Sequence, residues 1–245
     1  MDPRPGGTAP PPPAPVRRWG LGDVLLGMVV GLCLSSVFAS AWLAVTGDAD
    51  LGLGGRAASQ VGLWTGLVGA VVLAARRKGS GRVAEDFGFR ARWSDLGTGV
   101  AAALGAQFVV VPLVALLLLP LLGRPEVSGP VEDLVNDARG PAFAGLVLTA
   151  VIGAPIVEEL FFRGLLLRSL EARFGTGWAV GGSSVIFGLS HPNDLSAAGV
   201  VVVMVSLAAL AALLAVLVVR TGRLAPAIVA HAAFNALNLA VAALQ

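Results

Sequence analysis

Residues 197–219 read AAGVVVVMVSLAALAALLAVLVV and contain no charged side chain. A helix needs about 20 consecutive apolar residues to cross the hydrocarbon core of a bilayer, which is about 30 Å thick. A helix also satisfies all of its backbone hydrogen bonds within the segment, as lipid requires. This stretch therefore predicts a transmembrane helix.

Similar apolar runs recur along the chain and predict about seven spans, with eight as the alternative count. The expected fold class is all-α, a polytopic transmembrane helical bundle. The composition agrees, because 56% of the residues are hydrophobic and 13% are charged, whereas about a quarter are charged in an average soluble domain. The predicted spans cover residues 21–45, 57–75, 96–122, 142–168, 177–191, 197–219 and 224–244.

The chain divides into three parts by composition. Residues 1–18 begin MDPRPGGTAPPPPAPV, a Pro- and Gly-rich stretch that predicts a disordered cytoplasmic tail. Residues 19–140 hold the N-terminal transmembrane helices and loops, and residues 141–245 form a transmembrane core with the candidate site described below.

The basic residues indicate an orientation. Cytoplasmic loops of membrane proteins carry an excess of Lys and Arg, and the chain has 17 such residues. A cytoplasmic N-terminus leaves Arg56, Arg124 and Arg139 outside and Arg163 within a span, with all the others inside. We therefore expect a multi-pass protein of the plasma membrane with its N-terminus in the cytoplasm and its C-terminus outside. The abundance of Arg, Ala, Gly and Val favours a bacterial source.

The ionisable residues within the spans are few and come together at one depth. Such a residue costs about 2.5–3.5 kcal/mol at the helix centre on insertion scales, so it marks a functional site by default. Counted along the helices from their cytoplasmic ends, these groups lie roughly 12–21 Å deep, and both histidines of the chain are among them. The set comprises Glu158, Glu159 and Arg163 of the fourth span, His191 of the fifth and His231 of the seventh. Two uncharged residues, Phe187 and Asn235, lie four residues from the histidines and complete the candidate site.

The two adjacent acids have different expected roles. Glu159 precedes Arg163 by four residues, the favourable order for an ion pair within one helix. Neighbouring side chains diverge by about 100° on a helix, so Glu158 is the carboxylate left to face a cavity. The alternative is that Glu158, Glu159 and Arg163 form one buried polar cluster with a structural role.

The other two helices supply an imidazole and an amide. His231 and Asn235 are four residues apart and share a helix face, and both are suitable donors to a developing oxyanion. Phe187 and His191 share a face as well, and we expect the phenyl ring to pack against the imidazole and orient it.

The motifs EExxxR, FxxxH and HxxxN, in this order on separate helices, resemble the motif set of the CAAX-protease and bacteriocin-processing family of intramembrane endopeptidases. That family includes prenyl-protein CAAX endopeptidases. The resemblance covers about residues 140–245, and it implies that Glu159 and Arg163 brace the fourth helix.

The resemblance also implies a hydrolytic mechanism. Glu158, assisted by His191, would activate a water for attack on the scissile carbonyl. His231 and Asn235 would stabilise the resulting oxyanion. The implied partners are a peptide or membrane-protein substrate and the lipid bilayer, with no nucleic acid.

Two questions stay open at this point. Glu158, His191 and His231 are suitable zinc ligands, and such proteins are often labelled metalloproteases, but a zinc ion bound by all three would leave only Glu159 as a base. We therefore expect no required metal, with zinc as the alternative. The second alternative is a non-proteolytic membrane protein, either a scaffold of the bacteriocin-immunity type or a transporter with a buried polar relay.

Overall fold

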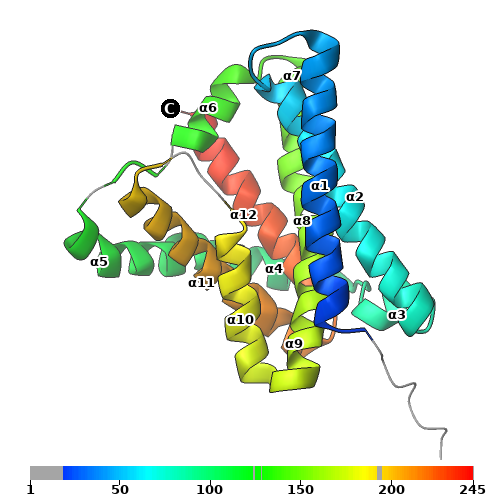
Figure 1. Ribbon diagram of the computed structural model, residues 1–245. Coiled ribbons are helices and arrows are strands. Elements are labelled where there is room, and N and C mark those ends of the chain that lie inside the picture. Colours follow the sequence, from blue (N-terminus) through cyan, green and yellow to red (C-terminus); the bar gives the residue numbers. More distant parts are fainter. Residues whose placement is uncertain (1–18, 124, 128, 192–194, 245) are drawn as a thin grey trace, which may run out of the picture.

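The computed structural model describes residues 19–244 except 124, 128 and 192–194 (Figure 1). In this part of the chain the secondary structure is helical and contains no strand, so the all-α prediction is confirmed. The predicted tail, 1–18, lies outside the described residues. The α-helices and π-helices (η) are α1 Leu21–Thr46, α2 Gly52–Lys78, α3 Val83–Phe87, α4 Trp93–Gly105, η1 Ala106–Val110, α5 Val111–Leu122, α6 Gly129–Asp137, α7 Pro141–Val147, η2 Leu148–Gly153, α8 Ala154–Glu158, η3 Glu159–Leu166, α9 Leu167–Phe174, α10 Thr176–Leu189, α11 Ala197–Thr221 and α12 Ala225–Ala243.

Six helical stretches of the described residues are long and apolar enough to cross a membrane. Two of them are composite: α4, η1 and α5 run on as Trp93–Leu122, and the elements from α7 to α9 run on as Pro141–Phe174. The fifth predicted span is α10, whose 14 residues reach about 21 Å, less than the core thickness. The molecule is therefore a multi-pass membrane protein with six long apolar helices and a shorter seventh.

The two ends of the bundle carry different elements (Figure 1). In this view α1 begins at the lower end, where α3 and α9 also lie, whereas the C-terminus lies at the upper end with α6 and α7. The chain thus starts α1 and finishes α12 at opposite ends, as an odd number of crossings requires. The short helix α6 occupies the loop between the third and fourth spans.

η3 runs through the middle of the bundle, and each of its eight residues is buried. It contacts α1, α2, α3, α10 and α11. A helix surrounded in this way can hold charged side chains away from lipid, provided that they find partners. This element carries Glu159 and Arg163.

Glycines bring α1 and α2 into close contact. A Cβ atom added at Gly62 would lie 2.5 Å from the backbone oxygen of Leu34, and one added at Gly66 would collide with the backbone of Gly31. Small residues allow such close backbone approach in membrane helices. The GxxxG spacing of α2 therefore serves packing within the chain.

Gly66→Ala should destabilise the protein even though Ala is the better helix former. Overpacking of this kind costs about 1–3 kcal/mol, which a thermal denaturation series in detergent would detect. Gly69→Ala is the matched control, because a Cβ at this exposed position on the same helix meets nothing within 4 Å. An equal melting temperature for both variants would contradict the close α1–α2 contact.

Candidate active site

The first contact of the candidate site joins the π-helix η2 to Asn235 of α12. In η2 the N–H of Ala154 donates to Thr149 O, five residues back, so it is turned away from Ala150 O. The next residue, Pro155, has no N–H to donate. The open carbonyl of Ala150 instead accepts from Asn235 Nδ2 at 2.8 Å. The π-helix and the proline therefore create the acceptor that fixes Asn235.

A buried ion pair lies one turn further along the same helix. Arg163 Nη1 donates to Glu159 Oε1 at 2.8 Å, and their side chains are 1% and 0% exposed. Arg163 Nη2 also donates to Ala211 O of α11, at 3.2 Å. The structure therefore contains the ion pair expected from the EExxxR spacing.

Glu159 has a second partner, His231 of α12. His231 Nδ1 lies 3.0 Å from the same oxygen, Glu159 Oε1. Because this oxygen already accepts from Arg163 Nη1, it acts as the acceptor in both contacts, and His231 Nδ1 carries the hydrogen. Glu159 thus links η3 to α12 and sets which nitrogen of His231 faces the other acid.

Glu158 lies between the Nε2 atoms of both histidines. Its Oε2 is 3.7 Å from His191 Nε2 and 3.9 Å from His231 Nε2. These distances are too long for direct hydrogen bonds, and Oε2 accepts none from the described residues although it is buried. Three helices therefore bring one carboxylate and two imidazoles together.

Phe187 orients His191, and the backbone fixes its tautomer. The two rings have centroids 4.6 Å apart, and His191 Nδ1 lies 2.8 Å from Phe187 O. A carbonyl oxygen only accepts, so Nδ1 is the protonated nitrogen. The fully buried Phe187 ring also lies 4.4 Å below the Arg163 guanidinium and 5.7 Å from the His231 ring, in cation–π and edge contacts.

Both histidines thus direct Nε2 toward Glu158. With Nδ1 protonated in each ring, a neutral His191 or His231 presents an Nε2 lone pair to the carboxylate. A protonated Nε2 on either ring would be attracted electrostatically to Glu158 Oε2. A cluster of one carboxylate and two imidazoles in this arrangement is chemically able to share a proton.

A cavity of about 670 Å³ leads to this cluster. Glu158, His191 and Asn235 are among the residues that line it, whereas His231 is not. Most of the wall is apolar and comes from α2, α6, α7 and α12, with Leu53, Val131, Leu134, Leu146 and Leu239 among its residues. Volume and lining suit a small or extended organic ligand.

The three candidate metal ligands were tested for fit. A tetrahedral zinc with bonds of about 2.1 Å would set its ligand atoms about 3.4 Å apart. The measured separations from Glu158 to His191 and His231, 3.7 and 3.9 Å, are wider. Among the described residues no group of three or more His, Cys, Asp or Glu side chains is arranged to hold a metal ion. As they lie, these side chains do not form a zinc site.

Comparison with protein-family models gives one assignment. Residues 140–237 match the model described as type II CAAX prenyl endopeptidase Rce1-like. This segment is therefore similar to the CAAX protease family. The match includes every residue of the three motifs, and it supports an intramembrane endopeptidase. Searches of curated proteins and of solved structures gave no significant match.

The geometry adds two features that the CAAX protease motifs did not predict. Glu159 was expected only to brace Arg163, but it also bonds His231, so both neighbouring acids flank the same imidazole. His231 lies behind Glu158 with 5% of its side chain exposed. No spacing rule signals a contact between residues 72 positions apart.

Glu159→Gln should lower stability far more than Glu158→Gln. Loss of one partner of a buried ion pair costs about 3–5 kcal/mol, and Glu159 serves both Arg163 and His231, whereas Glu158 Oε2 accepts no hydrogen bond from the described residues. Thermal denaturation of the two purified variants gives the comparison. Equal losses, or a larger loss for Glu158→Gln, would contradict the contacts described.

Proposed function

We propose that the chain is an intramembrane endopeptidase that hydrolyses a peptide bond with a water activated by Glu158. The observation that supports this most directly is the position of the Glu158 carboxylate, which lies on the cavity wall and within 4 Å of two imidazole nitrogens. A carboxylate so placed can act as a general base. The CAAX protease match supports the same class of reaction.

In the proposed reaction a cavity water gives its proton to Glu158 as its oxygen attacks the scissile carbonyl carbon. His191, whose Nε2 is 3.7 Å from the carboxylate, assists by sharing that proton. Glu158 then returns the proton to the leaving amine nitrogen as the carbon–nitrogen bond breaks. The residues end the cycle in their starting protonation states.

The negative oxygen of the tetrahedral intermediate needs donors. The Asn235 amide carries two hydrogens; one is used on Ala150 O, and the second can reach the cavity. His231 donates from Nε2 when its ring is doubly protonated, and the Glu159 carboxylate on Nδ1 balances that positive charge. Each such donor typically contributes about 10²–10³ in rate.

The cavity wall suggests the class of substrate. Its apolar residues would receive apolar side chains beside the scissile bond, and Arg56 and Gln60 of α2 add polar groups to the wall. We therefore propose a hydrophobic peptide or the edge of a membrane-protein helix as the substrate. Extended chain is needed at the scissile bond, because a helix hides its carbonyls in hydrogen bonds.

The proposed orientation follows the basic residues. With α3 and α9 at the cytoplasmic side, the N-terminus is inside and the C-terminus outside the plasma membrane. Residues of α6 and of the start of α2 are among those that line the cavity, and both elements lie at the opposite end of the bundle (Figure 1). Substrate would then enter from the outer side.

A non-proteolytic role is the alternative, either as a scaffold for a partner peptide or as a proton relay in a transporter. The same cluster of one carboxylate and two imidazoles could bind or pass a proton without cutting a chain. Loss of the Glu158 charge separates these roles, since a scaffold tolerates it and a hydrolase does not.

Glu158→Gln and His191→Ala should abolish cleavage. Purified protein would be assayed with quenched fluorogenic peptides that carry apolar residues on both sides of the scissile bond. Removal of the base should reduce the rate by about 10²–10⁴, while Asp48→Asn, at an exposed position between α1 and α2, should retain the wild-type rate. Equal rates for all four proteins would reject the protease proposal.

The purified enzyme should remain active without a transition metal. We expect less than about 0.1 zinc per chain by elemental analysis and unchanged peptidase activity after treatment with a strong chelator, because in the proposed mechanism Glu158 activates the water as a base and the 3.7 and 3.9 Å separations are wider than the separation of about 3.4 Å in a tetrahedral zinc site. Stoichiometric zinc, together with loss of activity on chelation and recovery on zinc addition, would overturn the metal-free mechanism.

Single cysteines should report the orientation. Cys33 is the only cysteine of the chain, so a Cys33→Ala background allows labelling of one site at a time. In intact cells a membrane-impermeant maleimide should label Ala49→Cys, between α1 and α2, and should label Ala84→Cys of α3 only after lysis. Both positions are exposed. The reverse pattern would contradict the proposed orientation.

A further inference from the structure

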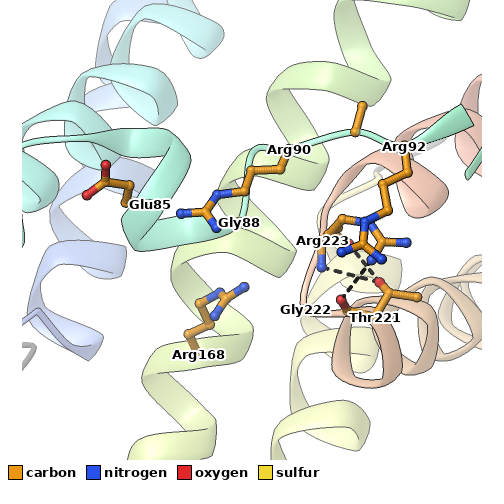
Figure 2. Close-up of a pocket in the computed structure, with 9 residues that line it drawn as sticks. Glu85, Gly88, Arg90, Arg92, Arg168, Thr221, Gly222 and Arg223 are labelled. Atoms are coloured by element: carbon orange, nitrogen blue, oxygen red, sulfur yellow. Dashed lines mark hydrogen bonds between the residues drawn. The ribbon is translucent and has the colours of Figure 1, made fainter. Parts of the chain in front are cut away.

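A second, basic pocket lies beside α3 and the start of α9 (Figure 2). It has a volume of about 430 Å³ and is formed by three separate segments: the connection between α2 and α4, the start of α9, and the turn between α11 and α12. Its lining residues are Glu85, Gly88, Arg90, Ala91, Arg92, Arg168, Thr221, Gly222 and Arg223.

Backbone contacts give this pocket a fixed shape. Leu224 N donates to Gly88 O at 2.8 Å, and Arg168 Nη2 donates to Phe87 O at 3.3 Å. Gly88 has φ +72°, which favours glycine, and a Cβ there would collide with the carbonyl oxygen of Gly222. The two loops are thus held against each other, and the arginines project from a defined frame.

The charges in the pocket are only partly balanced. Asp95 accepts from Arg223 Nε at 3.0 Å and from Nη2 at 2.5 Å. Glu85 is bonded to Arg82 outside the pocket at 2.9 Å, and this guanidinium holds the pKa of the Glu85 carboxyl below its usual value. In the part of the chain that the structure describes, neither Arg90 nor Arg92 forms an ion pair. Two exposed guanidinium groups are therefore available to an anion.

The aromatic neighbours of these arginines indicate their depth. Phe89 is 43% exposed and Trp93 is 94% exposed, and these two residues flank Arg90 and Arg92 in FRARW. Exposed aromatic rings gather at the level of lipid headgroups. Basic pockets at this level bind anionic headgroups, so the pocket lies where phosphate groups are concentrated.

We propose that this pocket binds a phosphate group of an anionic ligand at the membrane surface. The planar fork of each guanidinium matches the oxygens of a phosphate with two parallel hydrogen bonds. Arg90 and Arg92 supply the exposed contacts, and Arg168 and Arg223 supply the remaining positive charge of the lining. The phosphate can belong to a lipid headgroup or to a free phosphate ion, and the experiment distinguishes the two.

The test measures ligand binding to the delipidated full-length protein by native mass spectrometry in detergent. The probes are phosphatidylglycerol, diacylglycerol without phosphate, and inorganic phosphate. The variant Arg90→Gln/Arg92→Gln is compared with Arg76→Gln/Arg77→Gln, which removes the same charge from exposed positions at the end of α2, outside the pocket. Arg92→Lys keeps the charge but removes the planar fork.

We expect the pocket variant to bind phosphatidylglycerol at least roughly tenfold more weakly than wild type, as loss of a charge-assisted hydrogen bond implies. The control variant should bind phosphatidylglycerol as tightly as wild type does, and Arg92→Lys should bind it with intermediate affinity. Diacylglycerol should show no specific binding to any of the proteins. The same pattern with inorganic phosphate alone would assign the site to the free ion. Equal weakening in both double variants, or no binding of either phosphate probe to wild type, would overturn the proposal.

Discussion

The arrangement of the site depends on one buried carboxylate, Glu159, which accepts hydrogen bonds from Arg163 and His231 through the same oxygen. An unpaired charge in this buried surrounding would be very unfavourable, whereas a carboxylate that accepts from two donors is tolerated, although Glu159 Oε2 accepts no hydrogen bond from the described residues. The consequence is geometric: with Nδ1 of His231 engaged, only Nε2 can face Glu158. Glu159 therefore determines which atom of His231 faces Glu158, the carboxylate proposed as the base.

The irregular backbone of the fourth span, like the buried charges, helps to position the site residues. Short π-helical segments mark functional sites in many helices, and here η2 and η3 lie on either side of Glu158. The π-turn at Thr149 and the missing N–H of Pro155 leave the Ala150 carbonyl to Asn235. In the proposed mechanism Asn235 would thus be positioned by a defect in the helix it faces, and a regular helix would remove its anchor.

The sequence predicted the helical architecture and the residues that come together in the site. It did not predict all the contacts between those residues. Apolar runs alone located the long helices, because the bilayer sets their length. Four-residue spacings placed Glu159 with Arg163 and Phe187 with His191, since both pairs lie within one helical segment. The bond from Glu159 to His231 was missed because it joins distant segments. The π-helices were missed because no local signal of length or propensity encodes them, whereas the short α10 coincides with the predicted span 177–191.

The two ends of the molecule differ in chemistry: an apolar cavity reaches the carboxylate and imidazoles from one end, and arginines gather at the other. The most direct test of the account is an experimental structure with resolved side chains at Glu158. We expect its carboxylate within about 4 Å of Nε2 of both His191 and His231, with His231 Nδ1 bonded to Glu159. A carboxylate more than about 10 Å from both imidazoles, too far to share a proton through one water, would contradict it.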